Sequence, residues 1–320
     1  MSALDKPSVS NHFLGVVDAK LTSLRKSLEG FGSVLVAYSG GVDSVFLAFM
    51  AHQALPGRAV AAIADSPSLP RSELREALQI AADFNFPVRV LKTAEFANAD
   101  YVSNPLNRCY FCKHELFSQL VPLAKELGLA VIAYGENASD VGDFRPGAEA
   151  AKEFHIRAPL KEVGLTKAEI RALSARFGLP TTDKPQMACL SSRVPHGEAV
   201  TEQKLGMIEA AESQLRSLGF VDVRVRHHEL PGAPIPSKSA TSPQLNNLAA
   251  PPTKPALARI EVGASELPRL LEATNAARIA EELKRIGYAH VTLDLLGYRR
   301  GGANDLAPTT SRLTTSTASG

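Results

Sequence analysis

The chain contains no tryptophan and only three cysteines among its 320 residues. So small and odd a number of cysteines cannot form the disulfide framework of a small secreted domain, and it favours a reducing compartment. No apolar run approaches the length of a membrane span, and the N-terminus lacks the charged region and apolar core of a signal peptide. The formal net charge of only +2 does not indicate a nucleic-acid binder. We therefore expect a cytoplasmic protein with neither a membrane nor a nucleic acid as its partner.

The composition is that of an ordinary soluble globular protein, with 45% hydrophobic and 21% charged residues. A chain of 320 residues is long enough for two domains, each with its own core.

The most informative segment is a small-residue loop, Ser-Gly-Gly-Val-Asp-Ser at residues 39–44, which follows the apolar run 34–38. An apolar run, a glycine-rich loop and the amphipathic stretch 45–55 together predict a strand, a phosphate-binding loop and a helix. Glycines let backbone N–H groups approach an anion, the serines add hydroxyl donors, and the helix N-terminus adds its dipole. The loop lacks the Gly-Lys-Ser/Thr of a Walker A motif. The loop resembles the SGGxDS pyrophosphate loop of the ATP pyrophosphatase family, which implies that ATP contacts Ser39, Gly40, Gly41, Asp43 and Ser44.

Strand and helix patterns alternate through the first half of the chain. The predicted strands are 34–38, 60–64, 88–91 and 130–134, and the predicted helices are 16–28, 45–55, 70–84, 111–127 and 166–177. This alternation indicates an α/β fold with a doubly wound parallel sheet, covered by helices on both faces. Ligands of such sheets bind at the carboxyl ends of the strands. Asp65, Ser66 and Gly135 follow predicted strands there, so we expect them at the same ligand site, which the resemblance of the loop implies is an ATP site.

The pattern changes near residue 186, which we take as the boundary between a first domain, 1–185, and a small α+β domain, 186–303. Its predicted elements are helices 202–218 and 267–286 and strands 221–227, 257–262 and 291–296. Between the first two strands, residues 231–255 are rich in Pro, Ser, Ala and Asn and have few charges, which predicts an inserted loop. We expect the Thr- and Ser-rich residues 304–320 to form a disordered tail.

Two cysteines, Cys109 and Cys112, form a CxxC at the start of a predicted helix, and Cys189 stands near the domain boundary. A helix start favours the thiolate form. This pattern alone permits a redox pair, a zinc site completed by His114 or His155, or purely structural cysteines. Three thiolates also suit a [4Fe–4S] cluster with one iron left open, which could hold exogenous sulfide.

Taken together, these motifs resemble the LarE-type ATP-dependent sulfur insertases of the PP-loop ATP pyrophosphatase superfamily, over roughly residues 15–303. The motifs that carry the resemblance are Ser39–Ser44, Ala64–Pro67, Asn107–Lys113, Gly135–Gly147 (with Asp140, Asp143 and Arg145), Cys189–Arg193, Val223–His227, Ala258–Glu261 and Gly297–Arg299. The segment 231–255 departs from the family pattern, which joins these two strands by a short turn.

The resemblance implies that the substrate is pyridinium-3,5-biscarboxylic acid mononucleotide, a small molecule. Its carboxylates would be adenylated by ATP, converted to thiocarboxylates and passed on to the nickel cofactor of lactate racemase and related enzymes. Some family members sacrifice the sulfur of the cysteine that matches Cys189. Others carry three cysteines, as this chain does, and use a cluster, with inorganic sulfide or another compound as the sulfur source. The family also suggests a homo-oligomer, a hexamer.

Individual side chains then receive expected roles. Asp43 and Asp140 are candidate ligands of Mg²⁺. Arg193 closely follows Cys189, and a cation at that place would favour the thiolate. Arg224 and Arg226 alternate along one strand face, where paired guanidinium groups suit a phosphate or carboxylate of the substrate.

The resemblance adds Glu212 and Glu261 as acidic residues near the substrate.

Two other functions remain open on the sequence alone. One is a tRNA thiolase, which would need an extended basic surface with aromatic residues. The other is an ATP- or AMP-sensing module, which would not need the thiols.

Overall fold

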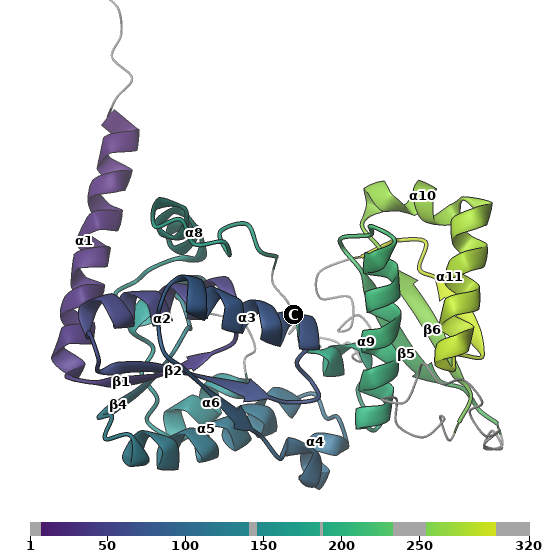
Figure 1. Cartoon of the computed structure of the whole chain (residues 1–320), viewed down its shortest axis with the longest axis horizontal. Helices are drawn as coiled ribbons and strands as arrows, with labels where there is room; N and C mark the ends of the chain where they lie inside the picture. Colours follow the sequence, from purple (N-terminus) through teal and green to yellow (C-terminus); the bar gives the residue numbers. More distant parts are fainter. Residues whose placement is uncertain (1–7, 141–145, 186–187, 233–253, 299–320) are drawn as a thin grey trace, which may run out of the picture. The chain divides into compact units, whose positions relative to one another are not determined.

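The computed structural model describes residues 8–140, 146–185, 188–232 and 254–298 (Figure 1). The chain divides into two compact units. The first unit comprises Met1–Ser191 and His196–Leu205, and the second unit comprises Ser192–Pro195 and Gly206–Gly320. Among the described residues, no helix combines the length and the apolar character that crossing a membrane requires.

The first unit contains a four-stranded, wholly parallel sheet in the order β3-β2-β1-β4, as the alternating pattern predicted. Its strands are β1 (Val34–Tyr38), β2 (Ala59–Asp65), β3 (Val88–Lys92) and β4 (Val131–Tyr134). The strand order reverses beside β1, since β2 pairs with one edge of β1 and β4 with the other. In parallel sheets a ligand crevice forms at such a reversal, at the carboxyl ends of the strands.

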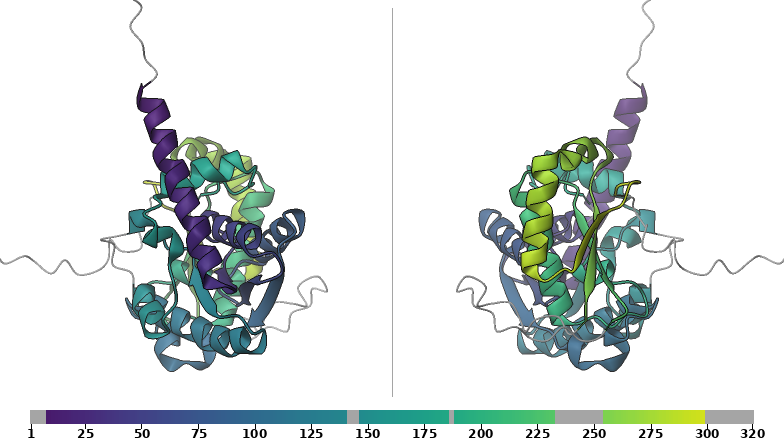
Figure 2. Two further views of the ribbon diagram at one scale, coloured as in Figure 1. Left: turned by 90° about the vertical axis from the view of Figure 1, so that its left-hand side faces the viewer. Right: turned by 90° about the vertical axis from the view of Figure 1, so that its right-hand side faces the viewer.

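Helices cover both faces of this sheet (Figure 1). On one face lie α1 (Ser8–Phe31), α2 (Val42–Ala54), α3 (Arg71–Asp83), α7 (Pro159–Glu162) and α8 (Lys167–Arg176). On the other lie α5 (Arg108–Glu126) and α6 (Pro146–Glu153). The short α4 (Ala99–Val102) precedes α5. The first turns of α1 extend beyond the rest of this unit (Figure 2).

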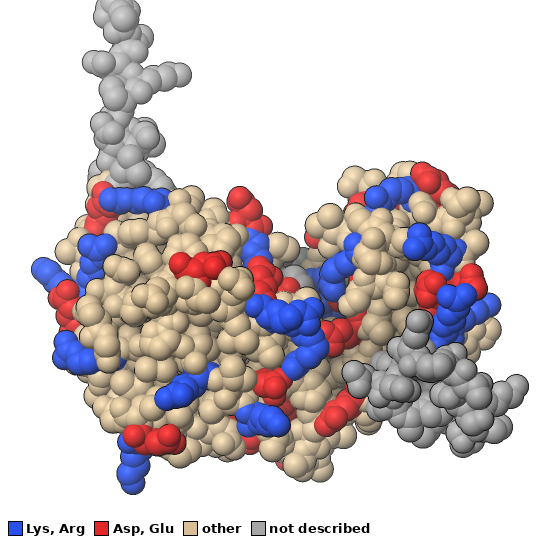
Figure 3. Space-filling model, in the orientation of Figure 1, with Lys and Arg blue, Asp and Glu red and all other residues tan. Residues whose placement is uncertain are grey.

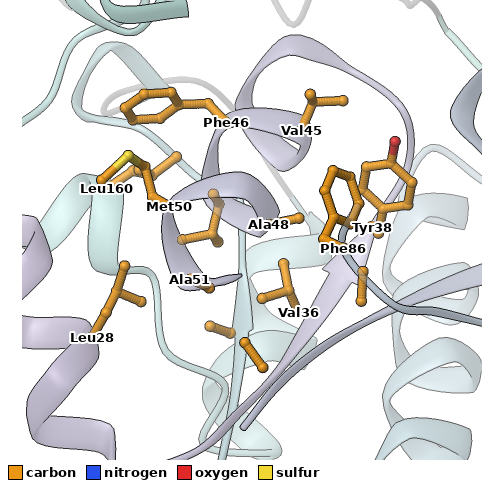
Figure 4. Packing of buried hydrophobic residues seen from close by; sticks show 14 of the residues in the cluster. Leu28, Val36, Tyr38, Val45, Phe46, Ala48, Met50, Ala51, Phe86 and Leu160 are labelled. Carbon is orange, nitrogen blue, oxygen red and sulfur yellow. The ribbon is translucent and has the colours of Figure 1, made fainter. Parts of the chain in front are cut away.

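Each face of the sheet has its own hydrophobic core, because side chains alternate along a strand. Val36 and Tyr38 point into the core under α2, whereas Leu35 and Ala37 point into the core under α5 and α6. Figure 4 shows the first core, in which the ring of Phe86 meets that of Tyr38 edge-on, with centroids 5.5 Å apart. Both cores hold the carboxyl ends of β1 and β4 in a fixed position.

The second unit is a small α+β structure with the sheet order β5-β6-β7. Its elements are α9 (Glu202–Ser217, most of which belongs to this unit), β5 (Arg224–Glu229), β6 (Ala256–Glu261), α10 (Leu267–Leu271), α11 (Ala273–Ile286) and β7 (His290–Leu293). Residues of α9 and α11 pack with Val225, Ala258 and Ile260 in one core. Figure 2 shows α11 beside the strands.

Three sequence predictions in this unit need correction. The single helix predicted at 267–286 is two helices, since Glu272 has an extended backbone (φ −55°, ψ 130°) and separates α10 from α11. The strand predicted at 291–296 ends at Leu293, and Leu295 and Leu296 are exposed. The strand predicted at 221–227 begins only at Arg224.

The predicted insertion, 231–255, and the predicted tail, 304–320, lie almost wholly outside the described residues, as do Asp143, Arg145 and Arg299. The described ends of the insertion lie together. The backbone N–H of Leu230 donates a hydrogen bond to the carbonyl of Pro255 (2.8 Å), directly beyond the paired residues Glu229 and Ala256.

Candidate active site

The phosphate loop lies between β1 and α2, and hydrogen bonds within the loop itself hold its shape. The Ser44 hydroxyl accepts from the backbone N–H of Ser39 (3.1 Å), donates to the carbonyl of Gly41 (3.0 Å), and lies 3.1 Å from the Ser39 hydroxyl. Gly40 has a φ of +71°, and a Cβ there would lie 2.7 Å from the Cβ of Ala77. Gly41 precedes α2, whose first turn has no side-chain cap. The backbone N–H groups in this first turn of α2 are therefore available to an anion.

Gly135 brings the end of β4 against this loop. A Cβ at Gly135 would lie 2.9 Å from the Ser44 nitrogen and 3.0 Å from the Asp43 carbonyl carbon. Because both neighbours are backbone atoms at a helix start, a larger residue would displace the loop. Gly135 thus packs directly on the phosphate loop, at the reversal in strand order.

Asp43 carries the most unusual electrostatics of the loop. One carboxylate oxygen accepts a hydrogen bond from Lys167 Nζ (2.6 Å), while Oδ1 is buried without a hydrogen-bond partner. Burial raises the pKa of Asp43; Lys167 opposes this shift, and the nearby Asp140 adds to it. Two acidic side chains and a buried, unsatisfied oxygen fit a hard divalent cation, which prefers oxygen ligands.

Asp65 and Ser66 lie at the end of β2, as predicted, but their side chains are engaged within the protein. Arg71 pairs with the Asp65 carboxylate and also donates to the carbonyl of Leu69 (2.8 Å). The Ser66 hydroxyl donates to the buried Glu95 and accepts from the backbone N–H of Ser68 (3.0 Å). These contacts order the turn after β2.

Cys189 lies in the first unit, and the residues that follow it are anchored to that same turn. The N–H of Leu190 donates to the carbonyl of Ser68 (2.8 Å). The hydroxyls of Ser68, Tyr101 and Ser191 form a closed buried ring of hydrogen bonds, with distances of 2.6, 2.8 and 2.8 Å. The position of Cys189 is therefore tied to the strand end beside the phosphate loop.

None of the three cysteines forms a disulfide bond, and the Cys189 thiol affects the pKa of both Cys109 and Cys112. Cys109 and Cys189 are exposed and Cys112 is half-buried. Surrounding protein atoms and the Cys189 thiol raise the pKa of Cys112 to about 12. The same two causes raise the pKa of Cys109, with Arg108 opposing them. The CxxC lies at the start of α5, as predicted.

The cysteines do not surround a single metal ion. Within the described part of the chain, no group of three or more His, Cys, Asp or Glu side chains is arranged to hold one. A zinc ion would draw its ligands to within about 2.3 Å of one point. A cluster spreads its thiolates over several irons, and three mutually interacting thiols in one unit are the donor set that it uses.

Lys113 lies at the same end of the sheet and was not singled out by the sequence. Its Nζ lies 5.6 Å from the ring centroid of Phe117 and 5.7 Å from that of Tyr134. Burial lowers the pKa of Lys113, while the thiols of Cys112 and Cys109 raise it. Lys113 thus places a desolvated cation beside the CxxC.

A second cluster of charged residues lies in the second unit, centred on Glu212 of α9. Arg193 is fully buried and donates through Nε to Glu212 Oε1 (2.9 Å). Arg216 donates to Oε2 (2.8 Å), and the backbone N–H of Val225 donates to Oε1 (3.1 Å). Burial alone would raise the pKa of Glu212, but Arg193 and Arg216 outweigh it and lower that pKa.

Arg226 and Glu261 form the other half of this cluster. Two parallel hydrogen bonds, of 2.9 and 3.0 Å, join the Arg226 guanidinium to the Glu261 carboxylate. Arg259, opposite Arg226 in the sheet, lies 3.2 Å from the same carboxylate. Arg224 lies on the same face of β5 as Arg226, and its Cζ lies 4.8 Å from the ring centroid of Tyr298. Among the described residues, Arg224 forms no salt bridge. Burial and the neighbouring Arg193 lower the pKa of Arg224.

The structure thus groups the predicted residues into two sets. The first unit holds Ser39, Gly40, Gly41, Asp43, Ser44, Asp65, Ser66, Gly135, Asp140, Cys109, Cys112 and Cys189, and the second unit holds Arg193, Glu212, Arg224, Arg226 and Glu261. The role expected of Arg193 beside Cys189 stays a prediction. Arg193 pairs with Glu212, and the guanidinium that we find at the Cys189 sulfur is that of Arg108, at 3.9 Å.

Two of the residues that sequence reasoning missed, Arg108 and Lys113, stand inside the motif 107–113 and flank the CxxC, so their charge was a usable signal. Lys167 gave no such signal, because 124 positions separate it from its partner Asp43.

Comparisons with known proteins agree with this arrangement. No family model matches the chain. The chain is 38% identical over 289 residues to the uncharacterized protein slr1717 of Synechocystis, covering 90% of this chain and 98% of that protein. It is 30% identical over 295 residues to the pyridinium-3,5-bisthiocarboxylic acid mononucleotide synthase of Lactiplantibacillus plantarum, covering 91% of this chain and 96% of the synthase.

A more distant relative is the tRNA-specific 2-thiouridylase MnmA of Rickettsia felis, with 28% identity over 189 residues, covering 48% of this chain and 52% of MnmA. The match to the synthase spans nearly the whole of both proteins, whereas the match to MnmA spans about half of each. With its parallel sheet and phosphate loop, the chain therefore belongs to the LarE family of sulfur-inserting enzymes, within the PP-loop superfamily.

Proposed function

We propose that this enzyme uses ATP to insert sulfur into pyridinium-3,5-biscarboxylic acid mononucleotide, the precursor of a nickel-pincer nucleotide cofactor. The observation that carries the proposal is a phosphate loop without a Walker lysine in the same unit as three cysteines that form no disulfide and whose thiols affect one another's pKa. The name of the L. plantarum relative gives a bisthiocarboxylic acid mononucleotide as its product, and sulfur insertion into the corresponding biscarboxylic acid would form that product. We further propose a cytoplasmic location and a homo-oligomer.

ATP would bind with its phosphates on the loop and on the first turn of α2, where uncapped N–H groups meet the positive end of the helix dipole. Asp43 and Asp140 would hold Mg²⁺, since the buried Oδ1 of Asp43 has no hydrogen-bond partner and the two carboxylates disfavour each other's charge. When bound, the ion supplies positive charge to the phosphates.

The proposed reaction has two steps, adenylation and sulfur transfer. A carboxylate oxygen of the substrate attacks the α-phosphorus of ATP, forming an acyl adenylate and releasing pyrophosphate. A sulfur nucleophile then attacks the acyl carbon, AMP leaves with the former carboxylate oxygen, and a thiocarboxylate remains. With hydrosulfide as the nucleophile, its proton passes to solvent.

The sulfur source divides the proposal into two forms. In the form we favour, Cys109, Cys112 and Cys189 hold a [4Fe–4S] cluster, which would supply an open iron site for inorganic sulfide. In the alternative, the Cys189 thiolate attacks the acyl carbon and AMP leaves, giving a thioester. Loss of the Cα proton to a base then breaks the Cβ–S bond, leaving dehydroalanine at residue 189 and sulfur on the substrate.

The second unit would bind the anionic groups of the substrate. Arg224 and Arg226 share one face of β5, and Arg193, Arg216 and Arg259 add further positive charge against the carboxylates of Glu212 and Glu261. Guanidinium groups in such pairs match phosphate and carboxylate in a bidentate manner.

Two other functions are less well supported. MnmA-like tRNA thiolation would need an extended basic surface. On the face of the first unit that Figure 3 shows, however, Lys and Arg are interspersed with Asp and Glu and with uncharged residues. A nucleotide-sensing module would have no use for the grouped thiols.

The test is to incubate anaerobically prepared enzyme with ATP, Mg²⁺, sulfide and the pyridinium mononucleotide, and to identify the products by mass spectrometry. We expect AMP, pyrophosphate and a thiocarboxylate, with repeated turnover if a cluster is used. One sulfur per chain and a mass loss at Cys189 would identify the sacrificial form. ADP and phosphate, or nucleotide binding without any product, would refute the proposal.

A further inference from the structure

Arg108 is a buried cation whose environment is incomplete. It is the first residue of α5 and only 5% exposed, yet among the described residues it has no carboxylate partner. Burying a charge without an opposite charge is costly, even where hydrogen bonds are present. A buried guanidinium in this situation calls for an anion beside it.

The contacts of Arg108 indicate where that anion lies. Nη1 donates to the side-chain oxygen of Asn104 and to the carbonyl of Ser191 (2.9 Å), and Nη2 lies 3.9 Å from the Sγ of Cys189. Arg108 also contributes a hydrogen bond and a favourable charge to the adjacent Cys109. The two arms of the guanidinium therefore hold the backbone just after Cys189 and the Cys189 sulfur at the same time.

We propose that Arg108 is the positioning residue of the sulfur-transfer step: it binds the Cys189 sulfur as its counter-anion and fixes it beside the CxxC. This inference rests on the proposed function and deepens it, since it identifies the cation that serves the sulfur site. It applies to either sulfur source, because both place negatively charged sulfur at Cys189.

The planar fork of arginine is needed for this role. A lysine at 108 retains the charge but is a single point donor, so it cannot hold the Ser191 carbonyl and the Cys189 sulfur together. Arg108→Lys should therefore keep the local positive charge but lose the positioning, whereas Arg108→Gln should lose both. Arg89→Gln is the matched control, since Arg89 is exposed on β3 and, among the described residues, its side chain has no ion pair or hydrogen bond.

The first test uses iron-free protein and needs no activity. Cys189 is alkylated in separate reactions with iodoacetate, which is anionic, and with iodoacetamide, which is neutral. Peptide mass spectrometry measures the rate of each reaction. The ratio of the two rates reports the local charge, because the thiolate fraction cancels. One charge about 4 Å away in a water-like medium changes such a ratio about fivefold. We expect the ratio of the iodoacetate rate to the iodoacetamide rate to fall in Arg108→Gln, because the positive charge that attracts iodoacetate is lost. The ratio should change little in Arg108→Lys or Arg89→Gln. An unchanged ratio in a folded Arg108→Gln protein would overturn the proposal.

The second test separates adenylation from sulfur transfer. Exchange of labelled pyrophosphate into ATP, measured with substrate but without sulfide, should persist in Arg108→Lys, while thiocarboxylate formation should fall at least tenfold. Equal thiocarboxylate rates in Arg108→Lys and the wild type would contradict the positioning role, and this variant stays informative even if Arg108→Gln does not fold. If the wild type itself makes no thiocarboxylate, the proposed function fails, while the alkylation ratio still decides the placement of Arg108.

Discussion

At the scale of single residues, the candidate ATP site combines a rigid loop with one destabilising carboxylate. Asp43 is held in a place where burial disfavours its charge, and only one of its oxygens has a partner. Ionisable groups whose pKa is shifted by burial are common at binding sites, where a ligand of opposite charge would stabilise the charged form.

Asp43→Asn should lower AMP formation at least tenfold without lowering the melting temperature of the nucleotide-free protein. A raised acid pKa means that the folded state binds this proton more tightly than the unfolded state. The charged form therefore opposes folding, and stability is lost as the pH rises from the ordinary carboxyl value to the higher value of Asp43. Asparagine keeps a hydrogen-bond acceptor for Lys167 and removes this loss. Melting curves across that pH range check the prediction, and a clearly lower melting temperature at neutral pH would contradict it.

Gly135→Ala should weaken ATP binding at least tenfold, because the added Cβ would lie 2.9 Å from the Ser44 nitrogen and push the loop away from its position. Gly30→Ala is the control, since a Cβ there meets nothing within 4 Å. Calorimetric titration with ATP measures both. Wild-type affinity in Gly135→Ala would show that the loop can move without loss.

At the scale of elements, an ion cluster joins α9 and β5, and in the proposed function part of this cluster also binds substrate. Glu212 is shared by two arginines and a strand N–H, whereas Arg224 on the same strand has no carboxylate of its own among the described residues. The two parts should respond differently to substitution.

Glu212→Gln should destabilise the protein by about 3–5 kcal/mol at neutral pH, the usual effect of leaving a buried charge without its partner. The pKa of Glu212 is lowered in the folded state, so its contribution is present above the ordinary carboxyl value and is lost as the pH falls through the lower, folded value. The difference between wild type and variant in urea unfolding should therefore shrink on acidification. A difference that does not change with pH would contradict this account.

Arg224→Gln should weaken use of the mononucleotide at least tenfold, because a charge-assisted hydrogen bond contributes about 1.5–3 kcal/mol. ATP binding and stability should change little, since Arg224 is not tied to a carboxylate within the described residues. Arg226→Gln should weaken substrate use and also lower stability, because it leaves the buried Glu261 short of its main partner. Steady-state kinetics with melting curves distinguish the two, and unchanged substrate use in both variants would remove them from the site.

Much of the fold was predictable from local patterns. The parallel sheet followed from alternating apolar strands and amphipathic helices, because each of these patterns is decided within a few residues. The break at Glu272 was not predictable, since the flanking residues continue a helical pattern and no Pro or Gly marks the break. The phosphate loop and the cysteines were visible as motifs, but the pairing of Asp43 with Lys167 and of Cys189 with Arg108 depends on tertiary contacts.

At the scale of the whole molecule, the two units carry separate tasks in the proposed reaction: nucleotide and sulfur in the first, and substrate anions in the second. We expect the segment 231–255 to serve neither task. Its flanking strands already pair up to Glu229 and Ala256 and are closed by the hydrogen bond from Leu230 to Pro255.

Replacing residues 231–255 with a short Gly-Asp turn should leave activity and stability near wild type. Long surface loops add only slowly to the cost of chain closure, so their removal changes little. Melting curves and AMP formation measure the outcome. Loss of folding would show that this segment packs against the protein.

In the proposed reaction a substrate carboxylate is adenylated before sulfur arrives, and oxygen labelling of the substrate distinguishes this order from any other. The mononucleotide is prepared with ¹⁸O in its carboxylates and allowed to react with ATP and sulfide, and the AMP is analysed by mass spectrometry. We predict one labelled oxygen in AMP for each thiocarboxylate formed, because AMP leaves with the carboxylate oxygen that attacked the α-phosphorus. Thiocarboxylate formed together with unlabelled AMP would contradict the account.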